Sequence, residues 1–478
     1  MRSPPAAVEL PAVRLEHSAE SPRASDRALP AVPGACTDSG QTDLLAASHR
    51  KHVPPAFSAA NGRGRRSHQR PERQAVSSRR AIERTNAETP LRLLAPRDAT
   101  ALRLRIAVLA PPWIPVPPRG YGGIEAVVEL LCEALVARGH DVTLFAAPGS
   151  RSIAHVHTLL EEPHPDTIGS ALHESDHVAC AWKQIEQAAA RGQAFDVLHD
   201  HSGFTALAMA DRVGVPVVHT IHGPFDRHMT RFYQRHGRAA TLVAISRSQA
   251  AAVPAGVRIS AVVPNPIAVD RWPLTTHKQD YVLWIGRMAP VKGAHVAIEA
   301  ARLAGKNLVL AGPVQTGQEQ YFREQIEPHV DGQRVRYVGE VAGAAKQQLY
   351  ANAQALLMPV RWPEPFGMVM IEALATGTPV IAFPEGAAAE IVIDGENGML
   401  VSDELQMARA IDQVGATGAI ESARCRASVA ERYDIAVTAT GYERVYRRAA
   451  GVERAPAALA RHIPSSGQVQ SPQRSAHR

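Results

Sequence analysis

Short apolar runs alternate with amphipathic segments along the middle of the chain. Residues 104–110 form a mostly apolar run that predicts a buried strand, and residues 124–138 carry apolar side chains at helical spacing until Gly139. A second apolar run at residues 142–145 predicts the next strand. This order of strand, glycine-containing loop, helix and strand is typical of a doubly wound parallel sheet.

The same order of elements begins again after a proline-rich segment at residues 264–276. A strand over residues 281–285 precedes a glycine-containing loop and a helix over residues 294–303. We therefore expect an α/β chain with two doubly wound, Rossmann-like domains that face a central cleft, over residues 104–272 and 273–435. Further strands are predicted at residues 197–199, 215–220, 242–245, 308–311, 336–338, 355–358 and 379–383.

Both ends of the chain depart from this pattern. Residues 1–103 are rich in Pro, Ser, Ala and Arg without a sustained period, so we expect disorder there and in residues 451–478, which follow a helix at residues 436–450. Residues 1–103 hold 17 basic and 10 acidic residues, and residues 454–478 add four arginines and no acid. Because the whole chain carries a net charge of +6, residues 104–453 carry −5, which argues against a nucleic-acid-binding core.

The four cysteines are too far apart for a metal-binding or disulfide framework. No CxxC pair occurs among Cys36, Cys132, Cys180 and Cys425, so a reducing cytosol is the simplest compartment. The sequence shows no apolar run long enough to span a bilayer and no signal peptide at its start. We expect a cytoplasmic protein, and peripheral contact with the inner face of the membrane stays open.

Two carboxylates flank the start of one predicted helix. Glu364 lies in the loop before this helix, and Glu372 lies about two turns inside it. The free N–H groups near Phe366, Gly367 and Met368 form an anion-attracting pole. A carboxylate beside that pole can bind the hydroxyls of a polyol whose phosphates lie on the amides. On its own, the same pattern is also typical of a first-turn charge and a solvated helix face.

Two cations and a pair of glycines lie in loops that follow predicted strands. Arg287 and Lys292 come after the first strand of the second domain, where they can neutralise a departing diphosphate. Gly122 and Gly123 lie between the first strand and its helix, where a phosphate or second substrate can approach the backbone closely. Each feature alone also fits a solvated loop or a plain tight turn.

Histidines follow two strands of the first domain. His222 comes at the end of a strand that Gly223 and Pro224 interrupt, so we expect it to face the cleft, although a structural role stays open. The sequence His199-Asp200-His201 offers two ligands on one strand face without an evident third, which argues against a zinc site. Ser246 follows another strand, and we expect it to cap a helix.

Taken together, these motifs resemble those of the retaining glycosyltransferases of family 4, which have the GT-B fold. The resemblance covers about residues 104–448 and is strongest over Glu364 to Glu372, which begins with Glu-Pro-Phe-Gly. Its other parts are Gly286-Arg287 with Lys292-Gly293, and Tyr121-Gly122-Gly123-Ile124-Glu125 with Gly139-His140-Asp141-Val142.

The resemblance implies an enzyme that moves a sugar from a nucleotide-sugar donor to an acceptor hydroxyl with retention of anomeric configuration. Arg287 and Lys292 would hold the donor diphosphate, Glu364 would contact the transferred sugar, and Glu372 would bind the ribose. Backbone contacts would come from Phe366, Gly367 and Met368.

The resemblance also assigns the other side of the cleft. Gly123 would border the phosphate and the acceptor, and His222 would lie near the anomeric centre. No cofactor and no metal ion are implied, because the two cations and the helix pole stabilise the leaving diphosphate. The segment 436–449 would be a terminal helix that crosses back onto the first domain. The acceptor could be a glycan, a lipid or a small molecule.

The chain departs from the family pattern in three places. Residues 1–103 match nothing in the family, Arg361-Trp362-Pro363 is bulkier than expected, and Asn265-Pro266 stands where many members have Asn-Gly. The bulky segment bears on selectivity for the donor sugar. Two alternatives stay open: a GT-B-type nucleotide-sugar epimerase, which needs no acceptor, and a non-catalytic module that binds nucleic acid or membrane through its basic tail.

Overall fold

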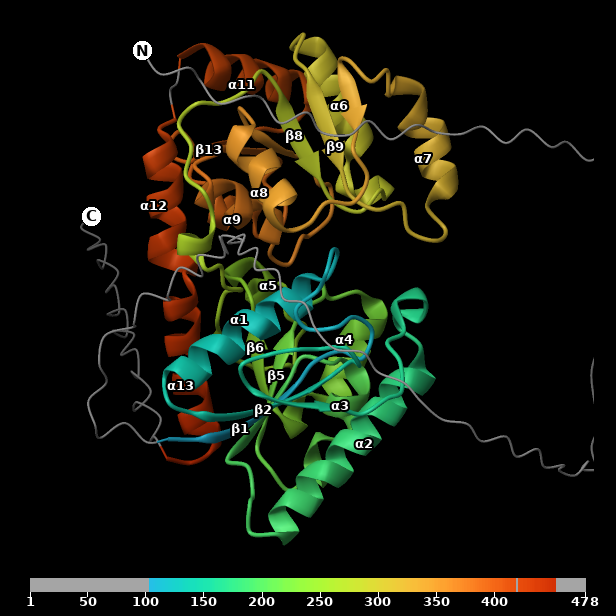
Figure 1. Ribbon diagram of the computed structural model, residues 1–478, viewed down its shortest axis with the longest axis vertical. Coiled ribbons are helices and arrows are strands. Elements are labelled where there is room, and N and C mark those ends of the chain that lie inside the picture. Colours follow the sequence, from blue (N-terminus) through green and yellow to red (C-terminus); the bar gives the residue numbers. More distant parts are fainter. Residues whose placement is uncertain (1–102, 418–419, 453–478) are drawn as a thin grey trace, which may run out of the picture. The chain divides into compact units, whose positions relative to one another are not determined.

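The computed structural model of the protein describes residues 103–417 and 420–452. The disorder predicted for residues 1–103 and 451–478 falls almost wholly outside the described residues. Within them, the fold contains two separate parallel sheets, each flanked by helices (Figure 1). This arrangement confirms the predicted α/β fold with two Rossmann-like units.

The first sheet has seven parallel strands in the order β3-β2-β1-β4-β5-β6-β7. Its central strands are buried on both faces, as their continuous apolar sequences require, whereas the edge strands β3 and β7 are partly exposed. The strands are β1 (Arg105–Leu109), β2 (Asp141–Ala146), β3 (His155–Thr158), β4 (Val197–Asp200), β5 (Val217–Ile221), β6 (Thr241–Ala244) and β7 (Ile259–Val262).

The second sheet has six parallel strands in the order β10-β9-β8-β11-β12-β13. In Figure 1 the strands of this sheet appear in yellow to orange and those of the first sheet in blue to green. The strands are β8 (Val282–Ile285), β9 (Leu308–Ala311), β10 (Val335–Tyr337), β11 (Leu356–Met358), β12 (Val380–Ala382) and β13 (Gly398–Leu400).

Helices connect most consecutive strands in both units; β2 leads to β3 without a helix, and α11 follows the last strand, β13. In the first unit they are α1 (Gly123–Ala137), α2 (Ala171–Ala190), α3 (Phe204–Ala208), α4 (Arg227–His236) and α5 (Arg247–Ala251). In the second unit they are α6 (Ala294–Leu303), α7 (Glu319–Gln325), α8 (Gly343–Asn352), α9 (Met368–Ala375), α10 (Ala388–Ile391) and α11 (Glu404–Thr417). Short 3-10 turns lie at Pro165–Thr167, Ala210–Arg212, Gly237–Ala239, Val269–Arg271, Pro290–Lys292 and Glu327–His329.

The last two helices join the units. Helix α12 (Ser422–Tyr433) packs against α9, whereas α13 (Ile435–Ala449) packs against α1 and β5 (Figure 1). The side chains of Tyr442 and Tyr446 in α13 are buried in the core that contains Leu104 and Val108. The C-terminal helix is therefore part of the first unit's interior, although it follows the second unit in sequence. None of the described helices is long and apolar enough to cross a membrane.

Candidate active site

A cavity of about 320 Å³, the central cleft, lies where loops from both units meet. The loop after β5 supplies His222, the loop after β8 supplies two cations, and the start of α9 supplies backbone amides. Loops at the carboxyl ends of parallel strands therefore bring these residues together, as the sequence pattern predicts. The predicted site residues that line the central cleft are Gly123, His222, Arg287, Lys292, Glu364, Phe366, Gly367 and Met368.

Lys292 and Glu364 form an ion pair in the wall of the central cleft. The distance from Nζ to Oε2 is 2.5 Å, and the two side chains are only 17% and 12% exposed. The indole Nε1 of Trp362 donates to the same Oε2 at 3.0 Å, and the ammonium lies 4.7 Å from the centre of the Trp362 ring. A carboxylate and an aromatic ring thus hold the ammonium in place. Trp362, which departs from the family pattern, contacts both charged groups.

Two glycines allow the backbone segments beside this ion pair to pack closely against each other. Gly293 has φ +74°, and a Cβ there would lie 2.4 Å from the carbonyl oxygen of Pro359. Gly386 has φ +58°, and a Cβ there would lie 2.2 Å from the carbonyl oxygen of Glu364. A residue with a side chain would both strain the backbone and displace these neighbours, so the close packing requires glycine.

Arg287 lies at the edge of the central cleft. Its guanidinium donates to Oε1 of Gln315 at 3.1 Å and lies 5.9 Å from the centre of the Tyr121 ring. Among the described residues no carboxylate forms an ion pair with Arg287. Its charge is therefore available to an anionic ligand, in contrast to the charge of Lys292.

The start of α9 adds partial positive charge to the same cavity. Gly367 precedes the helix with φ +89°, and a Cβ there would lie 2.6 Å from the terminal methyl carbon of Met370. The first N–H groups of a helix lack intrahelical acceptors, so the end of α9 attracts anions. With Arg287 and Lys292, this pole makes the central cleft complementary to a diphosphate.

Glu372 is not among the residues that line the central cleft. It is 8% exposed, and its two carboxylate oxygens accept hydrogen bonds from Nζ of Lys346 at 2.6 Å and from the hydroxyl of Tyr350 at 2.8 Å. Both partners belong to α8. Its ribose-binding role stays a prediction, because a ribose hydroxyl would have to share this carboxylate with Lys346 and Tyr350.

A chain of buried histidines connects the central cleft to α13. Nε2 of His222 lies 2.9 Å from Nδ1 of His201, and Nε2 of His201 lies 3.2 Å from Nδ1 of His199. The same Nδ1 of His199 lies 2.7 Å from the hydroxyl of Tyr446, and Nε2 of His199 lies 2.8 Å from Oγ1 of Thr220. We call His222, His201, His199 and Tyr446 the histidine chain. It joins distant parts of the sequence, since 247 positions separate His199 from Tyr446.

Burial keeps the imidazoles of the histidine chain neutral. Burial lowers the pKa of His222 to about 3, with a further contribution from the neighbouring His219. Burial and the neighbouring imidazoles also lower the pKa values of His199 and His201 well below their usual range. In the described part of the chain, no group of three or more His, Cys, Asp or Glu side chains is arranged to hold a metal ion. His199 and His201 instead bond to each other.

The hydrogen-bonding capacity of Tyr446 sets the direction of the protons. Within the described residues its hydroxyl bonds only to His199, and leaving that buried proton unpaired would cost about 1–3 kcal/mol. Tyr446 therefore donates to Nδ1 of His199. Nε2 of His201 carries a proton toward the same atom, because two unprotonated ring nitrogens 3.2 Å apart would repel each other, and the two donors share the single lone pair of Nδ1. Nδ1 of His201 then accepts from the Nε2–H of His222. His222 is left with an unprotonated Nδ1, so it is a hydrogen-bond acceptor for a ligand.

A second cavity, of about 1090 Å³, adjoins the central cleft; we call it the wide cavity. The two cavities share Tyr121, Gly123, Ile124 and Arg287 as lining residues. The wide cavity is also lined by Glu125, which is only 4% exposed. Burial raises the pKa of Glu125 to about 7. Two ligands that meet at Gly123 and Arg287 can therefore occupy neighbouring cavities.

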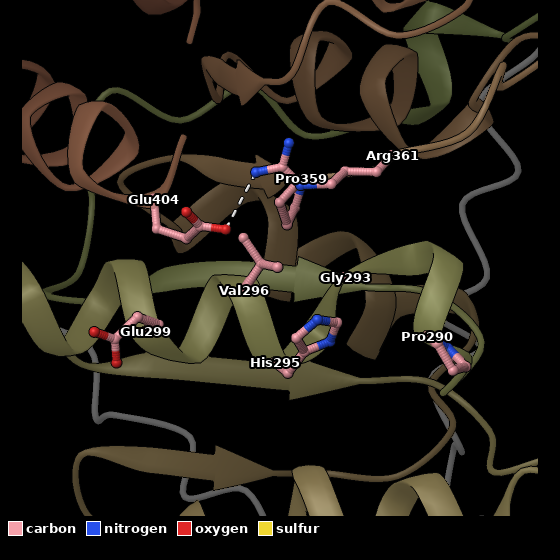
Figure 2. A pocket seen from close by; sticks show the side chains of 8 residues that line it. All are labelled: Pro290, Gly293, His295, Val296, Glu299, Pro359, Arg361 and Glu404. Atoms are coloured by element: carbon pink, nitrogen blue, oxygen red, sulfur yellow. Dashed lines mark hydrogen bonds and ion pairs between the residues drawn. The ribbon is translucent and has the colours of Figure 1, made fainter. Parts of the chain in front are cut away.

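The residue before Trp362 faces another pocket of about 320 Å³ (Figure 2). Arg361 and Glu404 point toward each other there, with 3.2 Å between the guanidinium and the carboxylate. Pro290 and Gly293 also line this pocket, so the loop that carries Lys292 separates it from the central cleft. Of the two bulky residues that depart from the family pattern, only Trp362 lines the central cleft.

The structure adds contacts that the sequence did not predict. Trp362 and Gln315 contact the charged side chains directly, and Tyr446 is distant in sequence from every residue of the cleft. The indole at Trp362 was visible as a departure from the family pattern, whereas nothing in the sequence marks Gln315 or Tyr446. The predicted helix cap at Ser246 is confirmed, since its Oγ accepts from the N–H of Gln249 at 2.9 Å.

Two protein-family models match adjoining parts of the chain. The model described as Glycosyltransferase Family 4 matches residues 121–271, and the model described as Glycosyl transferases group 1 matches residues 268–427. The boundary between the two matches falls in the proline-rich segment between the two sheets. Together they include every residue of the central cleft.

Individual proteins are similar over most of their own length. A glycogen synthase of Mycobacterium tuberculosis is 27% identical over 395 residues, which covers 71% of this chain and 94% of that protein. A phosphatidyl-myo-inositol mannosyltransferase of Mycolicibacterium smegmatis is 27% identical over 386 residues, which covers 73% and 95%. The crystal structure of AviGT4, a glycosyltransferase involved in avilamycin A biosynthesis, superposes with a TM-score of 0.55 and 27% identity, covering 73% of this chain and 98% of that one.

Proposed function

The chain belongs to the family 4 glycosyltransferases with the GT-B fold, and we propose that it transfers a sugar with retention of anomeric configuration and without a bound metal ion. The observation that carries this proposal is the set of charges in the central cleft. Arg287, Lys292 and the start of α9 converge on one cavity, next to the carboxylate of Glu364. This pattern fits a sugar diphosphate, because the phosphates need positive charge and the sugar hydroxyls need acceptors.

Donor binding uses the charged groups differently. Arg287 has no carboxylate partner among the described residues, so it can bind a phosphate oxygen directly. Lys292 is paired with Glu364, so a donor would draw its ammonium toward the diphosphate and leave the carboxylate to accept sugar hydroxyls. The indole of Trp362 would keep Glu364 oriented during this exchange.

The reaction exchanges one bond at the anomeric carbon. The acceptor oxygen bonds to this carbon on the face from which the donor oxygen leaves, and the electron pair of the breaking C–O bond passes to the diphosphate. The leaving phosphate oxygen takes the proton of the acceptor hydroxyl. Arg287, Lys292 and the helix pole stabilise the charge that develops on the diphosphate. His222 offers its unprotonated Nδ1 to a sugar hydroxyl and so orients the ring.

The same charges support the proposal of metal independence. Two cations and a helix start provide positive charge at the diphosphate, which is the function that a divalent ion performs in other transferases. Chelation of divalent ions is therefore expected to leave donor binding unchanged.

Thermal-shift measurements on the full chain test the donor site. UDP-, GDP- and ADP-sugars are each added with and without EDTA. We expect one of them to raise the Tm equally in both conditions, because a ligand that binds the folded state stabilises it. No shift with any of the three would contradict the donor site, and a shift that EDTA abolishes would contradict metal independence.

A pair of lysine substitutions then assigns the effect to the central cleft. Lys292→Ala is expected to remove the donor-induced shift and to lose about 2–4 kcal/mol of transition-state stabilisation, about 30- to 900-fold in kcat/KM. Lys306→Ala removes the same charge from a lysine that pairs with Asp280 at 3.0 Å and does not line the cleft, so it should retain both. Normal turnover of Lys292→Ala would refute its role, and an NMR spectrum of inverted product would refute retention.

A further inference from the structure

The wide cavity indicates the chemical class of the acceptor, an inference that rests on the proposed transfer reaction. It adjoins the central cleft at Tyr121, Gly123 and Arg287, so a molecule in it reaches the place where the donor diphosphate would lie. Its volume of about 1090 Å³ is more than three times that of the central cleft, which leaves room for several sugar rings.

Carboxylates outnumber cations around the wide cavity. The acidic residues that line it are Glu125, Glu161, Glu162, Asp166 and Glu340, and the cations are Arg119 and Arg287. Arg287 is committed to the donor diphosphate in the proposed reaction, which leaves Arg119 as the lining cation for the acceptor. A phosphate-bearing acceptor would meet like charges from the protein and from the bound donor. An uncharged polyhydroxylated molecule would meet hydrogen-bond acceptors.

Glu125 is the carboxyl group built most firmly into the wall of this cavity. It lies in the first turn of α1, directly after Gly123 and Ile124, which line both cavities, and it is 4% exposed. Among the described residues no other side chain forms a hydrogen bond or ion pair with its carboxyl group. The carboxyl group accepts a hydrogen bond from its own backbone N–H, and its remaining lone pairs can accept from an acceptor hydroxyl.

We propose that the acceptor is an uncharged carbohydrate and that Glu125 binds the hydroxyl region that attacks the donor. Tyr121, 43% exposed and shared by both cavities, presents a ring against which a sugar ring packs. Anionic acceptors, such as inositol phosphates or phosphoinositide headgroups, are disfavoured by the surrounding carboxylates.

Matched acceptor pairs test the charge preference. The full chain is assayed with the donor that raises its Tm, and the release of nucleoside diphosphate is measured. The two acceptor pairs are methyl glucoside with glucose 6-phosphate and myo-inositol with myo-inositol 1-phosphate. Maltotriose is added as a longer uncharged acceptor. The uncharged member of each pair is expected to have a kcat/KM at least tenfold higher. Equal or faster transfer to the phosphorylated members, or no transfer to any uncharged carbohydrate, overturns the proposal.

Substitutions separate the cavity charge from the role of Glu125. Neutralising Glu161, Glu162 and Asp166 together with amide residues is expected to reduce the preference for uncharged acceptors several-fold. Glu125→Ala is expected to raise the acceptor KM at least tenfold and leave the donor-induced Tm shift intact, which also shows that the variant folds. Glu129→Ala is the matched control, because Glu129 is on the same helix and does not line the wide cavity.

These results distinguish the two proposals. A Tm shift with a nucleotide sugar but an unchanged acceptor KM in Glu125→Ala would overturn the acceptor assignment and leave the donor site standing. The absence of any donor-induced shift would instead count against the proposed transfer reaction itself.

Discussion

His201 provides a test of the histidine chain that does not touch the substrate. His201→Phe keeps a planar ring at a fully buried position but removes both ring nitrogens, so the Nε2–H of His222 loses its acceptor. His201→Asn is the matched variant, because its amide oxygen can occupy the place of Nδ1 and accept the same proton. The two variants therefore differ in whether His222 keeps its tautomer.

The magnitude follows from the hydrogen bonds that each variant loses. A buried donor without a partner costs about 1–3 kcal/mol, so in His201→Phe the His222 ring is expected to change its tautomer or rotate away. At about 1.4 kcal/mol for each tenfold change, loss of the correctly oriented acceptor predicts a decrease in kcat of about 10- to 100-fold. His201→Asn is expected to stay within a few-fold of the unmodified protein, with donor affinity unchanged in both variants.

Two measurements read out this difference. Initial rates at saturating donor separate kcat from KM, and two-bond 1H–15N correlation spectra of histidine-labelled protein report which ring nitrogen of His222 carries the proton. A folded His201→Phe variant with an unchanged kcat would refute the positioning role. A spectrum of the unmodified protein with the proton on Nδ1 of His222 would refute the direction of the histidine chain.

Two other predictions concern the backbone of the cleft and its buried carboxyl group. Gly386→Ala is expected to displace Glu364 and cost about 1–3 kcal/mol of stability, together with a tenfold loss of donor affinity, measured by denaturation and calorimetry. Gly395→Ala, with φ +75° and no atom within 4 Å of the added Cβ, is its control and should retain affinity. Glu125 has a pKa of about 7 in the folded protein against an ordinary value of 4.5. The free energy of unfolding therefore decreases as the pH rises from 4.5 to 7, by up to about 3 kcal/mol, because the unfolded chain releases this proton more readily. Glu125→Gln should therefore raise the Tm at pH 8 and not at pH 4; equal effects at both values would contradict the pKa argument.

The parts of the site that were predictable from sequence are those at the carboxyl ends of strands. His222, Arg287 and Lys292 each follow a strand of a parallel sheet, and this position places each at the carboxyl edge of its own sheet, where the two edges meet at the central cleft. The predicted strands exist, with ends that differ by one or two residues. The strands that the sequence pattern missed include the edge strands β3 and β7, whose partly exposed residues do not form apolar runs.

The contacts that orient the site were not predictable in this way. The sequence pattern places Glu372 inside α9 but does not predict that its carboxylate bonds to Lys346 and Tyr350 of α8, and its role at a ribose stays a prediction. The pairing of Trp362 with Glu364 depends on a loop conformation that periodicity does not describe. The bond between Tyr446 and His199 joins residues 247 positions apart, and local pattern carries no information about such a pair.

Stability alone does not explain why the first unit buries the histidine chain. Replacing a buried polar network by apolar residues of similar volume is often neutral or stabilising, so three neutral imidazoles in a core have no stabilising advantage over Leu or Phe. They do affect the cleft, because the hydrogen bond from Tyr446 determines which ring nitrogen of His199 is protonated. The bonds that follow then determine the tautomers of His201 and His222. The helix that supplies Tyr446 is also the one that connects the second unit to the core of the first. We therefore expect the position of α13 and the acceptor character of His222 to be coupled, so that a displacement of this helix would change the tautomer of His222 without moving any residue that lines the cleft.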